Sequence, residues 1–203
     1  MPDREPASAD PMTEDAANPT PWARARDHLE GVPATYWLAT VRPNGAPHVM
    51  PLLAVWVDGG LFFSAGERTR KARNLALDSQ CVVMVEEEPL DFVLEGTADK
   101  VRDTATLQRV GDAYADVYGW RVAVRDGAFH DTEGAPTAGP PPYDVYEVTP
   151  NVAFGFGTDE TVVPTRWRFR ERRGPRQDCR AARRGVSARG AGRGRQRPSP
   201  APQ

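Results

Sequence analysis

Short runs of apolar and aromatic residues alternate with turn residues along the middle of the chain, a pattern typical of β-strands. The turn signals Arg42-Pro43-Asn44-Gly45 and Asp58-Gly59-Gly60 separate some of these runs. The predicted strands cover residues 35–41, 47–57, 61–64, 81–86, 92–101, 143–148 and 152–156. Pro51 removes a backbone donor from the second run, which predicts an edge, a bend or a bulge there. Strands joined by hairpins, with few helices, predict a mainly β fold, an antiparallel barrel rather than a doubly wound sheet.

Helical patterns are fewer. The predicted helices cover residues 20–31, 67–78 and 104–118. Thr20 is expected to cap the first helix, with Pro21 at its first position and Gly31 at its end. The third helix has apolar residues at helical spacing. The stretch 125–142 is rich in glycine and proline and is expected to be a loop.

The two ends of the chain differ in composition from this middle part, which leaves one domain over residues 20–169. Residues 1–19 are rich in Pro, Ala, Asp and Glu and have almost no large apolar side chain, so we expect a disordered segment. Residues 170–203 carry 11 arginines against two acidic residues and are also expected to be disordered. This tail is either a basic arm for acidic partners or an out-of-frame ending. We favour the second, because GC-rich DNA encodes Arg, Ala, Gly and Pro in any frame.

The charge balance and the small number of cysteines and histidines argue against nucleic-acid binding and metal binding by the folded part. Without the tail the chain has 15 basic and 26 acidic residues, so nucleic-acid binding by the folded part is not expected. Cys81 lies in an apolar run and is expected to be a buried, inert thiol, and Cys179 lies in the tail. With His28, His48 and His130 they form no metal-ligand pattern. No stretch is apolar enough to span a bilayer and the acidic N-terminus is unlike a signal peptide, so a cytoplasmic location is expected.

The start of the second predicted helix is the feature that points to chemistry. Residues 68–73 contain four cations, which the helix dipole disfavours by about 0.3–1 kcal/mol each. A solvated helix face is one explanation. A phosphate site is the other, because free N–H groups and cationic side chains bind anions, and Ser64, Gly66 and Thr69 add small or hydroxyl side chains. Charge alone leaves both open.

Three segments follow one another in a specific order and spacing: residues 39–51 (ATVRPNGAPHVMP), 61–64 (LFFS) and 69–75 (TRKARNL). With residues 93–98 they resemble the pyridoxamine 5′-phosphate oxidase-like, flavin-binding split-barrel family over about residues 22–169. The resemblance implies a six-stranded antiparallel split barrel that forms a homodimer, with two cofactors in clefts between the subunits. It implies an oxidoreductase that transfers a hydride between FMN, or the deazaflavin coenzyme F-420, and a small organic substrate.

Carried onto this chain, the resemblance implies that Arg70 and Lys71 hold the cofactor phosphate, with Ser64 nearby. The stretch 48–52 would run along the isoalloxazine ring, largely through backbone groups, and residues 166–167 would close the cleft from this subunit or its partner. The predicted cofactor-binding residues are His48, Val49, Met50, Pro51, Leu52, Ser64, Arg70, Lys71, Arg166 and Trp167.

No catalytic residue is assigned, because in such enzymes the cofactor performs the redox chemistry. Arg68 and Arg73 are assigned to the surface. The aromatic residues Trp37, Trp56, Phe62 and Phe63 are expected in the core or a dimer interface rather than against the ring. The alternative function is a non-catalytic flavin- or haem-binding module.

Overall fold

The computed structural model describes residues 5–14, 18–30, 33–131, 139–158 and 162–170. They belong to the first of two compact units, Met1–Glu171. Gly31, the loop residues 132–138 and the tail from residue 171 lie outside the described residues.

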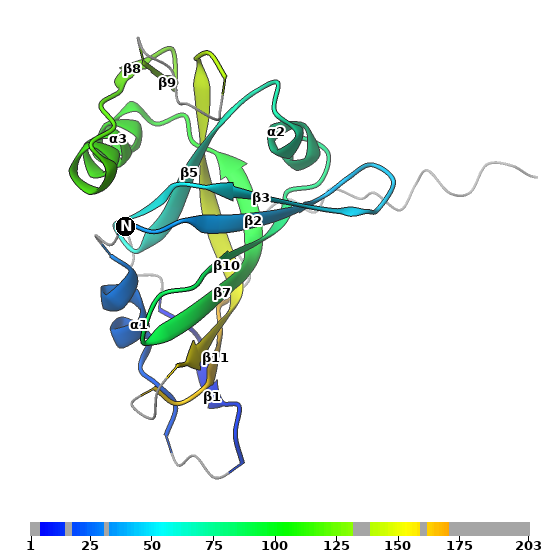
Figure 1. Ribbon diagram of the computed structural model, residues 1–203, viewed down its shortest axis with the longest axis vertical. Coiled ribbons are helices and arrows are strands. Elements are labelled where there is room, and N and C mark those ends of the chain that lie inside the picture. Colours follow the sequence, from blue (N-terminus) through cyan, green and yellow to red (C-terminus); the bar gives the residue numbers. More distant parts are fainter. Residues whose placement is uncertain (1–4, 15–17, 31–32, 132–138, 159–161, 171–203) are drawn as a thin grey trace, which may run out of the picture. The chain divides into compact units, whose positions relative to one another are not determined.

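Antiparallel ladders join seven strands in the order β3–β2–β6–β7–β10–β5–β4 (Figure 1). Their bounds are Tyr36–Val41 (β2), Pro47–Leu52 (β3), Ala54–Val57 (β4), Gly60–Gly66 (β5), Gln80–Val85 (β6), Leu90–Lys100 (β7) and Tyr143–Gly157 (β10). β3 and β4 form one run that is broken only at Leu53; β3 pairs with β2, and β4 pairs with β5. The chain itself therefore joins the two ends of this path. The predicted class, mainly β with an antiparallel sheet, is confirmed.

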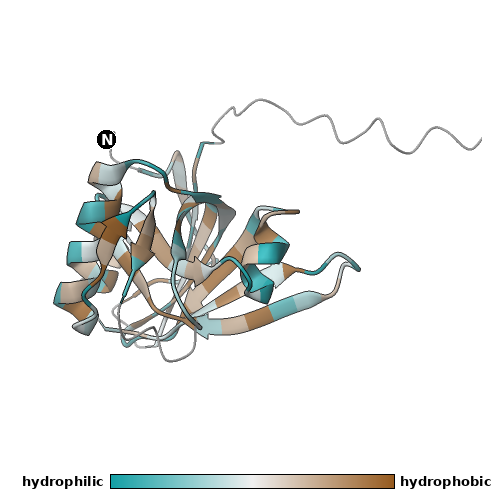
Figure 2. Ribbon diagram, turned by 90° about the horizontal axis from the view of Figure 1, so that it is seen from above, coloured by the Kyte–Doolittle hydropathy of each residue, from teal (hydrophilic) through white to brown (hydrophobic). Residues whose placement is uncertain are grey.

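Buried side chains form two clusters, one on each face of β5. Phe63 points into the larger cluster, among the strands, while Phe62 points into the smaller one, beneath helix α3 (Thr104–Tyr118). Helix α1 (Trp22–Leu29) adds Trp22 to the larger cluster. Because α3 covers the outer face of β5, nearly every residue of that strand is buried, which explains its continuous apolar sequence. In Figure 2 the helix ribbons change between hydrophilic and hydrophobic residues, as expected for helices with one face on a core.

Helix α3 has the predicted bounds because both of its ends are defined by side-chain or backbone chemistry. The Asp103 carboxylate accepts hydrogen bonds from Thr106 Oγ1 at 2.7 Å and from the Thr106 N–H at 2.8 Å. These hydrogen bonds hold the pKa of Asp103 below its ordinary value. At the other end Gly119 adopts a left-handed conformation with φ of 71°.

The N-terminal segment contains a strand that composition did not predict. β1 (Ser8–Pro11) pairs antiparallel with β11 (Thr165–Arg168), and an ion pair joins Asp10 to Arg168 at 2.5 Å. β11 offers a free sheet edge, and the segment needs only main-chain groups to pair with it. The prediction of a disordered segment over residues 1–19 therefore does not hold for Ser8–Pro11.

Two helix predictions need correction. Thr20 does not cap α1; its hydroxyl group donates to the Val163 carbonyl at 2.9 Å and accepts from the Val163 N–H at 3.0 Å. These long-range hydrogen bonds tie the start of α1 to the C-terminal part of the domain. The second predicted helix is shorter than residues 67–78, because α2 covers only Arg70–Leu75.

One loop prediction and one strand prediction also need correction. The predicted loop 125–142 overlaps a hairpin of β8 (Ala123–Arg125) and β9 (Ala128–His130), whose turn places Asp126 and Gly127 at positive φ. This Asp-Gly pair is a hairpin signal of the kind used elsewhere in the chain. The predicted strands 143–148 and 152–156 are one strand, β10, with a register shift between Pro150 and Val152.

Gly96 lies opposite that irregularity, where the two backbones approach closely. A Cβ atom at Gly96 would lie 2.2 Å from the Thr149 carbonyl oxygen. Gly96→Ala is expected to lower the free energy of unfolding by about 1–3 kcal/mol, because backbone cannot move aside without breaking the ladder. Urea unfolding measures the change. In the matched variant Gly60→Ala the Cβ atom meets side chains and no backbone, the Phe62 ring at 3.0 Å and Glu147 Oε1 at 3.4 Å, so this variant should cost less; an equal loss would contradict this explanation.

Candidate functional site

The backbone pairing splits at Leu53. The β4–β5 ladder ends at the pair Ala54–Phe63, and β3 pairs only with β2 among the described strands. From Ser64 to Gly66, β5 pairs with β10 on one side and with no described strand on the other. Two strand edges thus carry backbone N–H and C=O groups that no described strand uses, and such groups can bind a flat ligand.

Two tyrosines of α3 donate hydrogen bonds to backbone carbonyls at this break in the pairing. The Tyr114 hydroxyl group donates to the Leu53 carbonyl at 2.9 Å. The Tyr118 hydroxyl group lies 2.8 Å from the Ala54 carbonyl oxygen, to which it donates. Burial raises the pKa of both tyrosines, so they remain neutral donors. Ser64 lies beside Tyr114, on the α3 side of β5.

Three cations lie within electrostatic range of His48. Arg42 follows β2, and Arg70 and Lys71 belong to α2. The pKa of His48 lies below its ordinary value, first through desolvation and then through the positive charges of these three residues. No carboxylate of the described residues forms an ion pair with any of the three.

Of these three cations, Lys71 shows most clearly that the positive charge lacks an anionic partner. Its side chain is half-buried, and desolvation lowers its pKa. The Nδ1 atom of His48 is buried and has no hydrogen-bond partner. A bound anion would offset both costs, because it would pair with Lys71 and could accept from the imidazole.

Side-chain contacts hold α2 beside His48. Asn74 Nδ2 donates to Thr40 Oγ1 at 3.0 Å, and Thr40 is the register partner of His48. Thr69 caps the helix: its Oγ1 accepts from the Ala72 N–H at 3.3 Å and donates to the Gly66 carbonyl at 2.8 Å. Because α2 has six residues and its own cap, its dipole adds little to anion binding. The anion site therefore rests on cationic side chains rather than on the helix start.

The structure brings two of the ten predicted site residues, Arg70 and Lys71, within electrostatic range of a third, His48. His48 lies beside Arg70 and Lys71, and Ser64 lies on the β5 edge beside the break. Along β3 most side chains are exposed, and β3 is an edge strand as Pro51 predicted; the bend falls two residues later, at Leu53. In this stretch the side chains of Val49, Met50 and Pro51 are exposed, and that of Leu52 is buried.

The prediction for Trp167 is wrong, because its side chain is fully buried in the larger core cluster. Its Nε1 donates to the Thr20 carbonyl at 3.0 Å, and a Cβ atom at Gly155 would lie 2.7 Å from its ring. No ligand can reach that ring without unpacking the core.

Arg166 also lies away from the site within the protomer. Its register partner on β10 is Phe154, whereas Ser64 pairs with Val145 on the same strand. Nine residues of strand separate these positions, about 30 Å. The Arg166 guanidinium instead lies 4.0 Å from Asp10.

The family model for pyridoxamine 5′-phosphate oxidase matches residues 24–155. The chain belongs to the pyridoxamine 5′-phosphate oxidase family. Comparison with curated proteins finds no match.

Solved structures of low identity are similar to this chain, and the two with TM-scores above 0.5 share its fold. Rv2991, a conserved hypothetical protein of Mycobacterium tuberculosis, is 19% identical with a TM-score of 0.55, over 73% of this chain and 92% of that one. A heme binding protein of Mycobacterium smegmatis is 15% identical with a TM-score of 0.53, over 71% of this chain and 57% of that one. An F420 reductase is 22% identical with a TM-score of 0.45, over 63% of this chain and 94% of that one.

The site of this pyridoxamine 5′-phosphate oxidase family member includes residues that sequence reasoning missed. Arg42 lies within the segment that carried the resemblance, and its charge was the available signal. Tyr114 and Tyr118 have helical spacing, but no pattern reveals that their hydroxyl groups reach the carbonyls at the break.

Other chemistry is limited in the part of the family member that the structure describes. No group of three His, Cys, Asp or Glu side chains is placed to hold a metal ion there. None of its described helices has the length and apolarity needed to cross a membrane. Cys81 is buried, as predicted, and burial raises the pKa of its thiol to about 12.

The charge around His48 gives a direct prediction. Lys71→Ala is expected to raise the pKa of His48, because it removes one nearby positive charge. Proton NMR titration measures it, with His48→Gln identifying the resonance. Arg125→Ala, an exposed arginine outside this group, is the matched control and should leave the pKa unchanged. A His48 pKa that Lys71→Ala does not raise would contradict the described arrangement.

Proposed function

We propose that this family member is an oxidoreductase that binds FMN or the deazaflavin coenzyme F-420 and transfers a hydride between the cofactor ring and a small organic substrate. The observation that supports it is the group of Arg42, Arg70 and Lys71, which has no carboxylate partner in the described chain and lies within electrostatic range of His48 on the edge strand β3. Family membership agrees with an oxidoreductase.

The residues present fit a flavin-type cofactor. Arg70 and Lys71 would bind its phosphate, because charge-assisted hydrogen bonds to phosphate compensate the desolvation that Lys71 now bears. The free edges of β3 and β5 would orient the ring through main-chain groups. When bound, the cofactor supplies the hydride chemistry.

His48 and Tyr114 would supply neutral polar groups. Since the pKa of His48 is lowered, its imidazole is uncharged near neutral pH and offers a hydrogen bond rather than a further positive charge. Tyr114 holds the Leu53 carbonyl, and so keeps β3 and β5 apart where the ring would enter. Tyr114 is in this sense a positioning residue.

We also propose that the protein is a homodimer, because an apolar sheet face is exposed. Trp37, Val49 and Met84 are 45%, 49% and 47% exposed, and register places Met84 and Pro51 beside Trp37. Val49 is the partner of Ala39 on the same face, while His48 pairs with Thr40 on the α2 side. Monomers seldom expose such contiguous apolar surface, so a second copy is expected to cover it.

Trp37→Glu is expected to convert the dimer to a monomer, because a carboxylate would be buried at the centre of the interface. Light scattering after size-exclusion chromatography measures the mass. Leu77→Glu is the matched control, since Leu77 is 73% exposed and lies after α2, away from this face. An unchanged mass for Trp37→Glu would exclude this face as the interface.

The second candidate is a non-catalytic flavin- or haem-binding module. The unpartnered Nδ1 of His48 favours it, because imidazole nitrogen is a haem ligand and the neighbouring cations could pair with propionates. Anaerobic assays distinguish the two. Return of the long-wavelength absorbance of the oxidised ring, when the reduced, bound cofactor is mixed with small organic acceptors, supports the oxidoreductase. Tight binding without transfer to any acceptor, or a haem Soret band, supports the module.

A further inference from the structure

We propose that a pocket between helix α1 and the start of β7 binds a small, uncharged, mainly apolar molecule that forms a hydrogen bond with His28. The pocket has a volume of about 570 Å³, which lies within the range of small-molecule sites. None of the residues assigned to the cofactor is among the described residues that line it. The inference therefore goes beyond the proposed function and does not depend on it.

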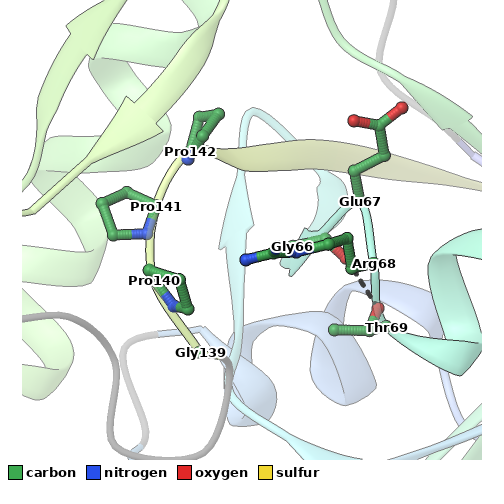
Figure 3. A pocket seen from close by; sticks show the side chains of 8 residues that line it. All are labelled: Gly66, Glu67, Arg68, Thr69, Gly139, Pro140, Pro141 and Pro142. Atoms are coloured by element: carbon green, nitrogen blue, oxygen red, sulfur yellow. Dashed lines mark hydrogen bonds between the residues drawn. The ribbon is translucent and has the colours of Figure 1, made fainter.

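The α1 pocket lies toward the opposite end of β10 from the proposed anion site. Leu90 lines the pocket and pairs with Gly157, the last residue of β10, whereas Ser64 pairs with Val145 near the first. Twelve residues of strand separate these two positions, about 40 Å along the strand. A different pocket, of about 380 Å³, begins at the turn 66–69 next to α2 (Figure 3). That second pocket adjoins the anion site, and the α1 pocket does not.

The walls of the α1 pocket are apolar at the base and charged at the mouth. Ala25, Leu90 and Val162 line it and are buried. Arg24 and Asp27 also line it and are exposed, so they lie on its open side. One carries a positive charge and the other a negative charge, so the mouth favours an ion of neither sign. An apolar base favours an uncharged ligand, because a buried ion would lose its hydration there.

His28 supplies the polar contact that the pocket offers to a ligand. Its Nε2 atom is buried and has no hydrogen-bond partner among the described residues, and its side chain lines the pocket. A buried polar atom without a partner loses its hydration and gains nothing in return. A ligand hydroxyl group would compensate this loss, because a hydroxyl donates to Nε2 or accepts from it, whichever tautomer is present. The structure therefore favours a ligand with an apolar body and one neutral hydrogen-bonding group.

Proton NMR of the full-length protein without cofactor tests the site, with phenol as the probe. Phenol is uncharged at neutral pH and carries one hydroxyl group on an apolar ring. Millimolar phenol is expected to shift the ring signal of His28 and the methyl signals of Leu90 and Val162 until they saturate. His28→Gln identifies the His28 signal. The signal of His130, which belongs to β9 outside the pocket, is the internal control and should not move.

A comparison of phenol with toluene isolates the hydrogen bond. His28→Leu keeps an apolar side chain and removes the ring nitrogens. The affinity for phenol is therefore expected to fall about fivefold, while that for toluene stays within about twofold. The methyl signals of Leu90 and Val162 follow both titrations. His130→Leu removes a half-buried histidine outside the pocket and is the matched control, which should leave both affinities unchanged.

The possible results either support this site or overturn it. Saturable shifts, with phenol bound more tightly than benzoate or benzylammonium, support a site for an uncharged ligand. The proposal is overturned by the absence of shifts, by equal shifts of the His28 and His130 signals, by tighter binding of either ion, or by unchanged phenol affinity in His28→Leu. None of these results bears on the proposed function, whose test is the uptake of a flavin-type cofactor.

Discussion

Replacing Arg70 and Lys71 together by alanine is expected to abolish cofactor retention through purification. Each side chain would donate a charge-assisted hydrogen bond to the phosphate, and such bonds contribute about 1.5–3 kcal/mol each. Their joint loss corresponds to an increase in the dissociation constant of roughly 10²–10⁴-fold. Titration with cofactor, followed by fluorescence, measures it in wild type and variant.

The matched control removes the same charge elsewhere. Arg73→Ala with Arg125→Ala deletes two exposed arginines that form no ion pair with described carboxylates. If this control weakens binding as much as the Arg70–Lys71 pair, the effect is one of net charge. Unchanged binding in the Arg70–Lys71 variant would mean that the phosphate lies elsewhere.

Replacing Trp167 by alanine is expected to lower the free energy of unfolding by about 3–5 kcal/mol. The indole is fully buried, contacts the Trp22 ring at a centroid distance of 5.5 Å, and donates to the Thr20 carbonyl. The variant would lose this packing and leave a buried carbonyl without its donor. Denaturant unfolding measures the change.

A second substitution distinguishes a core role from a cofactor contact. Trp167→Phe keeps most of the packing, so it is expected to cost less stability and to leave the cofactor dissociation constant unchanged. A Trp167→Phe variant of normal stability that loses its cofactor would contradict the core assignment and restore the role that the resemblance implied.

Much of the fold could be predicted because local chemistry determines it. Asp103 and Gly119 define the two ends of α3 through a side-chain cap and a left-handed residue, and both are readable in the sequence. Pro51 marks an edge strand because it lacks a backbone donor, and β3 is such a strand. Strand alternation elsewhere reports which face is buried.

The remainder depends on partners that are distant in sequence. Ser8–Pro11 form a strand only because β11 supplies main-chain groups more than 150 residues later, which composition does not reveal. For the same reason, the Thr20 hydroxyl group forms a hydrogen bond with Val163 and does not cap its own helix. Trp167 was assigned to the cleft because residues 165–167 resemble the family's C-terminal element, and only the fold shows that its side chain packs into the core.

The candidate site was likewise only partly predictable from the sequence. Arg70 and Lys71 were evident as crowded cations, but only the three-dimensional arrangement brings Arg42 to the same point and shows that α2 is too short for its dipole to matter. Arg68 and Arg73 were assigned to the surface, and both are exposed.

The most direct measurement is the absorption spectrum of the full-length protein purified from a host that makes both FMN and coenzyme F-420. The proposed site predicts a bound chromophore with a flavin or deazaflavin long-wavelength band, near one per subunit, and the band position names the cofactor. A colourless protein that takes up neither cofactor on titration would contradict the account.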